Sequence, residues 1–473
     1  MDAETLSRAQ FALTASFHFI FPPLSMGLGL MLVVIGVIYV RTKDPKWRRL
    51  SFFWVKVYGL IFALGVATGV VQEFEFGMNW AEYSRFVGNV FGSLLAAEGV
   101  FAFFLEGGFL GLMLFGGNRL GPRLWLFSIL MVVLGAHFSA LWIIMANSWM
   151  QTPQGFTIAT DPAPTRAVMT DFWQVVFTPS FMPRLLHVFA ASWTVGAALM
   201  MSVSAWYVLK KKHLDLATAN MKVALPAFIL FATANILVFG PNQAIEVTNE
   251  QPLKLASMEG LWQSESCARM YLVGWVDVST QTTTGVSIPC LLSFLAYQDI
   301  NATVAGIDSF APAPTPPVNL LFQVYHFMIM VGSALVPIGL LGGLLYLWKR
   351  KLYEVRWVLW LLVITVFAGE ATITAGWWTA EVGRQPWVVY NVLATAQGVS
   401  PVLSATDVVI SLGMFIVLYG LLLVLFLYLL NRKIQEGPEE LEAVETAEVS
   451  TLPDTFRDIF SRRRRAADLG DEP

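Results

Sequence analysis

Long apolar segments constrain this chain more than any other feature of its sequence. A helix that crosses the hydrocarbon core of a bilayer needs about 20 apolar residues. Because a spanning helix satisfies its own backbone hydrogen bonds, we expect an all-α integral membrane protein with about nine transmembrane helices. The expected spans are residues 10–40, 52–76, 90–116, 123–147, 182–209, 221–241, 318–348, 355–378 and 405–431.

The composition agrees with a membrane protein. Hydrophobic residues make up 56% of the chain and charged residues 13%, whereas about a quarter of the residues in soluble domains are charged. The net charge of −3 gives no indication of nucleic-acid binding. Cys267 and Cys290 are too few for a disulfide scaffold or a cysteine-rich metal site. Both fall in a predicted external loop, so a bridge between them and two free thiols both stay open.

The basic residues predict the orientation of the helices. Most of the 30 Lys and Arg residues lie in every second connection and in the C-terminal tail. The positive-inside rule places those segments in the cytoplasm and the N-terminus outside, as an odd number of spans also requires. We therefore expect a membrane domain over 1–431 with an external loop at 242–317, followed by a disordered cytoplasmic tail over 432–473.

Several ionisable side chains lie in or beside the predicted spans. Charged groups are costly in hydrocarbon, so such residues are candidates for function. Imidazole, thioether and carboxylate groups can also bind haem iron. A single buried histidine is more often an ordinary hydrogen-bonded residue, so the pattern alone leaves a cofactor cluster and simple packing both open. The residues are His18, Glu98, Glu106, His137, His187, His326, Glu370 and Glu381, most of them in the outer half of the membrane.

Seven segments resemble one family, subunit I of the cytochrome bd quinol oxidases. They follow the family's order over residues 7 to 430, and AEVGRQPW is the most distinctive of them. The segments are SRAQFALTASFHFIFPPLSMG (7–27), FALGVATGVVQEFEFGMNW (62–80), LLAAEGVFAFFLEGGFLG (94–111), SALWIIMANSWMQ (139–151), LLHVFAASWTVGA (185–197), QPLKLASMEG (251–260) and AEVGRQPW (380–387).

The resemblance implies three haem cofactors: a low-spin haem b, a high-spin haem b and a haem d. His187 and Met330 would be the axial ligands of the low-spin haem iron. His18, Glu98 and Glu381 would serve the irons of the high-spin pair, with the pairing left open. The resemblance also implies that Trp377 and Arg384 lie beside the haems.

The resemblance further implies a function and a direction for protons. Lys254 and Glu259 match the family's quinol-binding residues, in an external loop of the short type. Quinol would be oxidised outside and dioxygen reduced to water with protons from the cytoplasm, which generates proton-motive force without pumping. Glu106 and Glu98, about 12 Å apart in depth along one helix, would relay protons with Ser139. A hydrogen-bonded tie between helices is the alternative role for Glu106.

Two positions depart from the family pattern. Met328 stands where the family often has Arg, and the loss of a positive charge beside a haem lowers its potential. His137 stands where the family has Asn, so the two residues together indicate a divergent branch.

Three other functions are weighed against this one: a cyanide-resistant variant with b haems only, a membrane b-type quinol dehydrogenase, and a transporter or channel with ion-binding carboxylates. The resemblance implies a prokaryotic cell membrane, a second large membrane subunit and, in many members, a single-span accessory peptide. The partners expected are quinol, dioxygen and lipid, and no nucleic acid. The quinone, the oxygen affinity and the haem order are not specified by the sequence.

Overall fold

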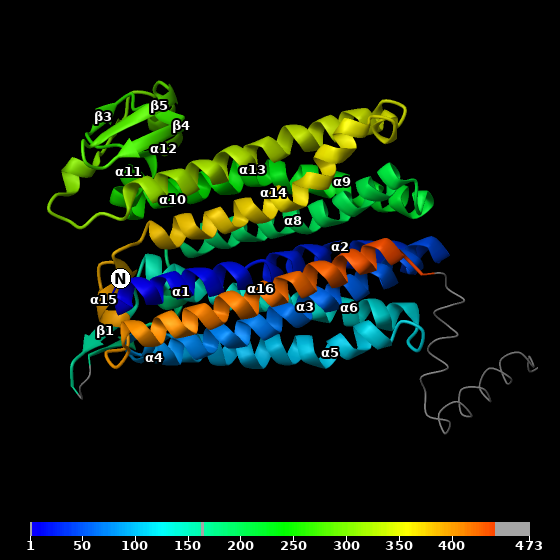
Figure 1. Cartoon of the computed structure of the whole chain (residues 1–473), viewed down its shortest axis with the longest axis horizontal. Coiled ribbons are helices and arrows are strands. Elements are labelled where there is room, and N and C mark those ends of the chain that lie inside the picture. The colour runs from blue at the N-terminus through cyan, green and yellow to red at the C-terminus, as the bar shows by residue number, and fades with distance from the viewer. Residues whose placement is uncertain (1, 162–164, 440–473) are drawn as a thin grey trace, which may run out of the picture.

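The computed structural model describes residues 2–161 and 165–439, and in this part nine helical segments are long and apolar enough to cross a membrane. They run roughly side by side (Figure 1). Their helices are α1 (Ala3–His18) with α2 (Phe21–Thr42), α3 (Pro45–Met78), α4 (Ala81–Ala97) with α5 (Phe104–Phe115), α6 (Pro122–Gln151), α8 (Phe181–Lys210), α9 (Leu214–Ala234) with α10 (Gly240–Glu250), α13 (Val318–Leu347), α14 (Arg356–Val382) and α16 (Ala405–Glu436).

The number of spans is therefore confirmed, with differences at some boundaries. The sixth span continues through α10 to Glu250, so the expected loop at 242–317 begins inside a helix. Similarly, α16 continues past the expected end of the membrane domain at residue 431. Residues 440–473 lie outside the described residues, so the disordered tail stays a prediction.

Short strands and helices fill the connections, which modifies the all-α expectation without changing the helical membrane domain. Four two-stranded antiparallel sheets pair β1 with β2, β3 with β6, β4 with β5 and β7 with β8. Figure 1 shows β1, β3, β4 and β5 at the end of the bundle where the N-terminus lies. The strands are β1 (Phe156–Ala159), β2 (Arg166–Met169), β3 (Glu265–Ser266), β4 (Met270–Asp277), β5 (Thr282–Ile288), β6 (Thr303–Val304), β7 (Trp387–Val389) and β8 (Leu393–Ala394). The connecting helices are α7 (Phe172–Val176), α11 (Pro252–Glu259), α12 (Leu291–Tyr297) and α15 (Thr395–Gly398), with short 3₁₀ segments at Ile307–Phe310 and Lys351–Tyr353.

Three interruptions shape the spans around the cavity. The first span bends after His18, because Pro22 and Pro23 cannot donate the backbone hydrogen bonds that a continuous helix needs. Two segments are π-helical, at Glu98–Phe103 and at Asn235–Phe239. Such segments are rare and often occur at functional sites.

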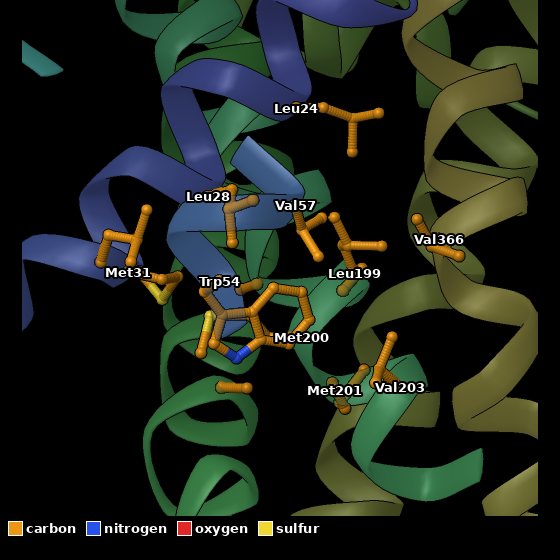
Figure 2. Packing of buried hydrophobic residues seen from close by; sticks show 14 of the residues in the cluster. Leu24, Leu28, Met31, Trp54, Val57, Leu199, Met200, Met201, Val203 and Val366 are labelled. Carbon is orange, nitrogen blue, oxygen red and sulfur yellow. The ribbon is translucent and has the colours of Figure 1, made fainter. Parts of the chain in front are cut away.

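The apolar core lies around α8, which packs against α2, α9 and α14. Figure 2 shows Leu28 of α2, Trp54 of α3 and Met200 of α8 together in this core. The indole Nε1 of Trp54 donates to Asn220 Oδ1 on α9 at 3.1 Å, so this buried N–H is satisfied by a neighbouring helix. A side chain at Gly27 or Gly196 would collide with the facing backbone, so both glycines allow α2 and α8 to approach closely.

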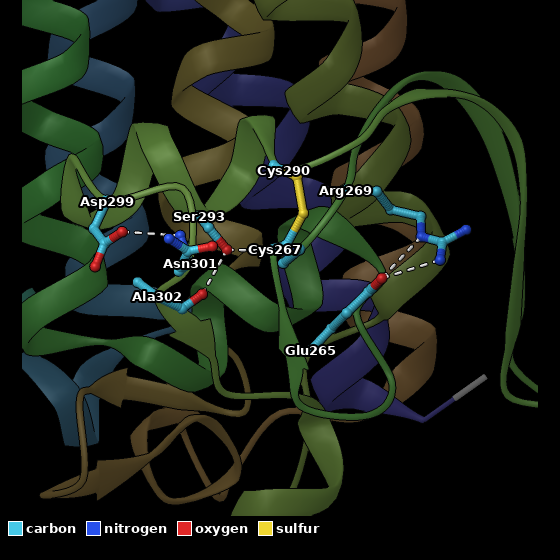
Figure 3. Close-up of a disulfide and its surroundings, with 9 residues drawn as sticks. Glu265, Cys267, Arg269, Cys290, Ser293, Asp299, Asn301 and Ala302 are labelled. Atoms are coloured by element: carbon cyan, nitrogen blue, oxygen red, sulfur yellow. Dashed lines mark hydrogen bonds and ion pairs between the residues drawn. A yellow bond between two sulfur atoms is a disulfide. The ribbon is translucent and has the colours of Figure 1, made fainter.

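The connection between α10 and α13 is held by the disulfide Cys267–Cys290, which resolves the choice that the sequence left open. Figure 3 shows the bridge beside Ser293, whose hydroxyl donates to the Ala302 carbonyl at 2.6 Å and accepts from the Ala268 amide at 2.8 Å. The bridge and these hydrogen bonds connect the segment before β4 to α12. This loop covers the end of α13.

Candidate functional site: a polar cavity within the helical bundle

A cavity of about 1370 Å³ opens between the helices. Its lining combines many apolar residues with a small number of ionisable ones, as cofactor pockets generally do. Most of the residues singled out from the sequence line it together. They are His18, Glu98, Glu106, His187, Lys254, Glu259, Trp377, Glu381 and Arg384.

The bend in the first span positions His18. Its Nδ1 lies 2.9 Å from Thr68 Oγ1 on α3, and the ring lies against Gly69, where an added Cβ would be 3.1 Å from Cε1. With Nδ1 in a hydrogen bond, Nε2 is the nitrogen left for a metal. Beside it, Trp377 of α14 stacks on Phe19 with ring centroids 5.5 Å apart.

His187 differs from an ordinary packed histidine. Its Nδ1 is buried and makes no hydrogen bond of normal geometry in the part of the chain that the structure describes, although the Asn235 side chain lies beside the ring. The ring lies beside Gly240, where an added Cβ would be only 3.7 Å from Cε1. Buried polar atoms are normally satisfied. An imidazole that lines a cavity and lacks a hydrogen bond of normal geometry therefore fits a ligand of haem iron.

Met330 lies apart from this arrangement. Its side chain is 41% exposed and is not among the described residues that line the cavity. Met328, one helical half-turn earlier, does line the cavity and contacts Gly376 of α14. The pairing of His187 with Met330 therefore stays a prediction.

Glu98, the first residue of the π-helical segment, and Glu106, which follows this segment, both face α6. The Ser139 hydroxyl donates to Glu98 Oε1 at 2.6 Å, so this residue of the expected relay does contact Glu98. Glu106 is buried, and its side chain occupies the space that a side chain at Gly135 would need. A π segment has a wider turn than an α-helix. The directions of Glu98 and Glu106 around the helix axis therefore cannot be taken from ideal α-helical geometry.

A chain of hydrogen bonds fixes Glu381 at the outer end of the cavity. Asn147 Nδ2 donates to Glu381 Oε1 at 2.8 Å, while Arg384 donates to the other carboxylate oxygen. Arg184 in turn donates to the side-chain oxygen of Asn147. Arg384 is only 4% exposed, and its Nε and Nη1 have no partner among the described residues, so part of this cation is left for an anionic group. Haem propionates have that charge.

Arg184 and Asn147 are site residues that the sequence reasoning missed. Arg184 lies one helical turn from His187, and that spacing is the signal that could have identified it. Glu73 and Glu75 were missed as well. Glu73 lines the cavity, whereas the buried Glu75 accepts hydrogen bonds from Gln10 at 3.1 Å and Thr14 at 2.7 Å.

Helix α11 places both candidates for quinol binding, Lys254 and Glu259, in the lining of the cavity. Lys254 is 3% exposed, and its ammonium donates to Gln151 Oε1 at 3.1 Å, Gln251 Oε1 at 3.2 Å and the Ala380 carbonyl at 3.1 Å. Burial, together with the nearby Arg184 charge, lowers the pKa of Lys254 below its usual value.

Glu259, at the end of α11, is 2% exposed, and burial raises its pKa to about 8. Neither of its carboxyl oxygens has a hydrogen-bond partner by geometry in the described chain. A carboxyl group with these properties can take up and release protons near neutral pH.

The fold and this cavity together define a multi-pass helical membrane protein with a site suited to haem. The family model for cytochrome bd terminal oxidase subunit I matches residues 6–438. The chain belongs to this family, as its motifs predicted, and is subunit I of a terminal oxidase. As a cytochrome it is a haem protein, and the designation as subunit I indicates that the oxidase has at least one further subunit.

Individual relatives agree with this assignment. The chain is 36% identical to cytochrome bd ubiquinol oxidase subunit 1 of Bacillus subtilis (strain 168), over 93% of this chain and 95% of that protein. It is 33% identical to cytochrome bd-II ubiquinol oxidase subunit 1 of Escherichia coli (strain K12), over 93% and 98% of the two chains. Among solved structures, the bd oxidase from Geobacillus thermodenitrificans matches with a TM-score of 0.86 and 27% identity, over 92% of this chain and 99% of that one. Both of these subunit 1 relatives are bacterial. This chain is likewise a bacterial multi-pass membrane protein.

Proposed function

We propose that this chain oxidises a quinol at the outer face of the cell membrane and that its haem groups use the electrons to reduce dioxygen to water. The names of the relatives support the substrate class, since two are ubiquinol oxidase subunits and a third, from Bacillus subtilis, is a putative menaquinol oxidase subunit. The observation that carries the proposal is one cavity that reaches from Lys254 and Glu259 to His187 and His18.

The proposed haem set is a low-spin haem b, a high-spin haem b and a haem d, with a b haem in place of haem d as the alternative. His187 and Met330 would hold the low-spin haem, and His18, Glu98 and Glu381 would serve the other two, beside Trp377 and Arg384. When bound, these groups supply one-electron transfer and the reduction of oxygen.

The chain's own residues handle the substrate and its protons. Glu259 accepts a proton from a quinol hydroxyl, because its raised pKa lets it bind and release protons near neutral pH. Lys254 orients a quinol oxygen or a partner carboxylate through its ammonium group. Both groups lie in the connection between α10 and α13, so the proposed direction of proton release is outward.

Protons for oxygen reduction would come from the cytoplasmic side. Glu106 and Glu98, with Ser139 hydrogen-bonded to Glu98, form the proposed relay along the α4–α5 span. Taking protons from one side and releasing them on the other generates proton-motive force without a pump. The proposed assembly includes a second large membrane subunit and a single-span accessory peptide.

The test uses the purified complex and the variant Glu259→Ala. We expect quinol oxidation to fall by at least about a hundredfold, because a positioned proton acceptor contributes that much or more, while carbon monoxide still binds to the reduced haems. The matched control is Glu265→Ala in the same loop, where Glu265 makes only an exposed ion pair with Arg269 at 3.0 Å. Normal turnover in Glu259→Ala would contradict the role of this carboxyl group.

Two measurements on the unmodified complex separate the alternatives. Pyridine haemochrome spectra distinguish a chlorin-type haem d from b haems alone. Oxygen consumption with a reduced quinone distinguishes an oxidase from a quinol dehydrogenase, and a complex without iron would favour a transporter or channel.

A further inference from the structure

His326 of α13 is a buried histidine with no role in the mechanism so far. Its Nδ1 lies 2.8 Å from the backbone carbonyl of Phe322, which can only accept, so Nδ1 carries a proton and Nε2 is the nitrogen that can exchange one. The ring stacks on Phe322 with centroids 3.9 Å apart and meets Tyr325 edge-on at 5.2 Å. These contacts fix the orientation of Nε2.

The fixed nitrogen faces the proposed proton acceptor. His326 Nε2 lies 3.7 Å from Glu259 Oε2, and neither atom makes a hydrogen bond of normal geometry within the described residues, although the Tyr325 side chain lies beside Glu259 and the Tyr271 backbone beside His326. The two side chains are 4% and 2% exposed. Two buried titratable groups that face each other with few hydrogen-bond partners are costly for stability, which favours a role in proton transfer.

Glu259 and His326 contact different parts of the structure. Glu259 lines the cavity, as does Tyr325, whereas His326 lies behind it and is not among the described lining residues. On its other side the ring has the backbone of Tyr271 as a neighbour, in strand β4 of the external hairpin. The pair therefore extends from the cavity to the outer loop.

The charged group nearest in sequence to Glu259 makes its hydrogen bonds away from Glu259 and His326. Tyr325 on α13 is the titratable neighbour of Glu259, and Tyr271 on β4 is the one beside His326. Lys254, although on the same helix as Glu259, directs its ammonium to Gln151, Gln251 and the Ala380 carbonyl.

We propose that His326 is the second proton acceptor in quinol oxidation and receives its protons from Glu259. This inference rests on the proposed function. Oxidation of a quinol to a quinone breaks two O–H bonds and releases two protons and two electrons. Bound haem groups would accept the two electrons. Glu259 takes the first proton and passes it to His326 Nε2, which frees the carboxylate for the second, and the imidazolium releases its proton outward past β4.

The distance is compatible with this transfer. At 3.7 Å the two atoms are slightly farther apart than in a hydrogen bond. Catalytic hydrogen bonds are often long before substrate binds and become shorter in the reacting complex. A rotation of the Glu259 carboxylate would close the gap.

The experiment compares the purified wild-type complex with His326→Gln, which keeps a polar side chain but cannot titrate. We expect kcat to fall by about a hundredfold with little change in KM and in haem content. We also expect the slope of log kcat against pH on the acid side to fall from about two to about one, because one of two required acceptors is gone. The control is His213→Gln at the start of α9, outside the cavity lining, which should behave as wild type.

A kcat within about twofold of wild type and an unchanged acid slope in His326→Gln would overturn the proposal. A merely structural histidine would alter KM or haem content without changing that slope. If wild type oxidises quinol and only this comparison fails, the proposed function stands and the inference does not. If wild type does not oxidise quinol, both are overturned.

A second measurement does not depend on how the variant folds. Infrared difference spectra of the wild-type complex with isotope-labelled histidine should show a new imidazolium signal when quinol is added without oxygen. The signal should persist in His213→Gln. Its absence from the wild-type spectra would overturn the proposal.

Discussion

The ammonium group of Lys254 donates a hydrogen bond of 3.1 Å to the backbone carbonyl of Ala380, the residue immediately before Glu381. Gln151, the last residue of α6, donates to the same carbonyl at 3.2 Å and accepts from the same ammonium at 3.1 Å. The ends of α6, α11 and α14 therefore meet at one point. A residue of the proposed quinol site is connected through a single carbonyl to a carboxylate proposed to serve a haem.

This connection predicts that Lys254→Met affects both places. Each hydrogen bond to a charged group contributes about 1.5–3 kcal/mol, so we expect kcat/KM for quinol to fall by at least about tenfold. We also expect a shift in the visible spectrum of the high-spin haems, because the backbone before Glu381 loses a partner. Steady-state kinetics and absorption spectra of the purified complex measure the two effects. Lys212→Met, exposed after the end of α8, is the control. An altered KM with unchanged spectra would refute the coupling.

The burial of Glu259 predicts a dependence on pH. Burial raises the pKa of this carboxyl to about 8, above its usual value, so it is largely protonated at pH 6 and largely ionised at pH 9. A proton acceptor must be ionised, so quinol oxidation should increase as the pH rises through about 8. His326 Nε2, 3.7 Å away, and the Tyr325 side chain face the same carboxyl. Rates measured across this range in Glu259→Gln should lack the increase, and a wild-type rate that falls over the range would contradict the assignment.

The sequence predicted the membrane part well because its signals are local. Apolar length identified nine spans, and the motif AEVGRQPW located Glu381 and Arg384, which lie a helical turn apart and form an ion pair. Contacts between distant segments were harder to predict. Arg184 and Asn147 are 37 residues apart, and no local pattern indicates that they join to hold Glu381. The strands of the external loops were also missed, because β4 and β5 alternate weakly in hydropathy and lie partly in solvent.

The positions of Met328 and Met330 lead to a comparison of two variants. The family resemblance assigns Met330 to the low-spin haem, whereas Met328 lines the cavity in the structure. If Met330 is the ligand, Met330→Ala should abolish the low-spin spectrum of the reduced haem b, because haem iron needs two strong axial ligands to be low-spin and alanine provides none. Met328→Ala should then leave the low-spin spectrum in place and serves as the matched control on the same helix. The reverse result, with the spectrum lost only in Met328→Ala, would transfer the ligand role to Met328.

Glu106 is the residue for which a relay and a structural tie make opposite predictions. Glu106 is 8% exposed and faces Gly135 of α6. The same helix carries Ser139, whose hydroxyl donates a hydrogen bond of 2.6 Å to Glu98. Glutamine has nearly the same shape and can keep a hydrogen bond between helices, but it cannot carry a proton. If Glu106 relays protons, Glu106→Gln should slow oxygen reduction by about a hundredfold or more while all haems stay bound.

The haem content and the rate of oxygen reduction after flash photolysis of carbon monoxide measure these two outcomes. The control is Glu82→Gln at the start of α4, where the carboxylate makes a surface ion pair with Arg85 at 2.6 Å, and such pairs contribute little. Loss of haem from Glu106→Gln, with the remaining complexes reducing oxygen at the normal rate, would instead assign Glu106 a structural role. Glutamate and glutamine have nearly the same shape and can both form hydrogen bonds, but only glutamate can carry a proton. This single substitution therefore separates the two roles.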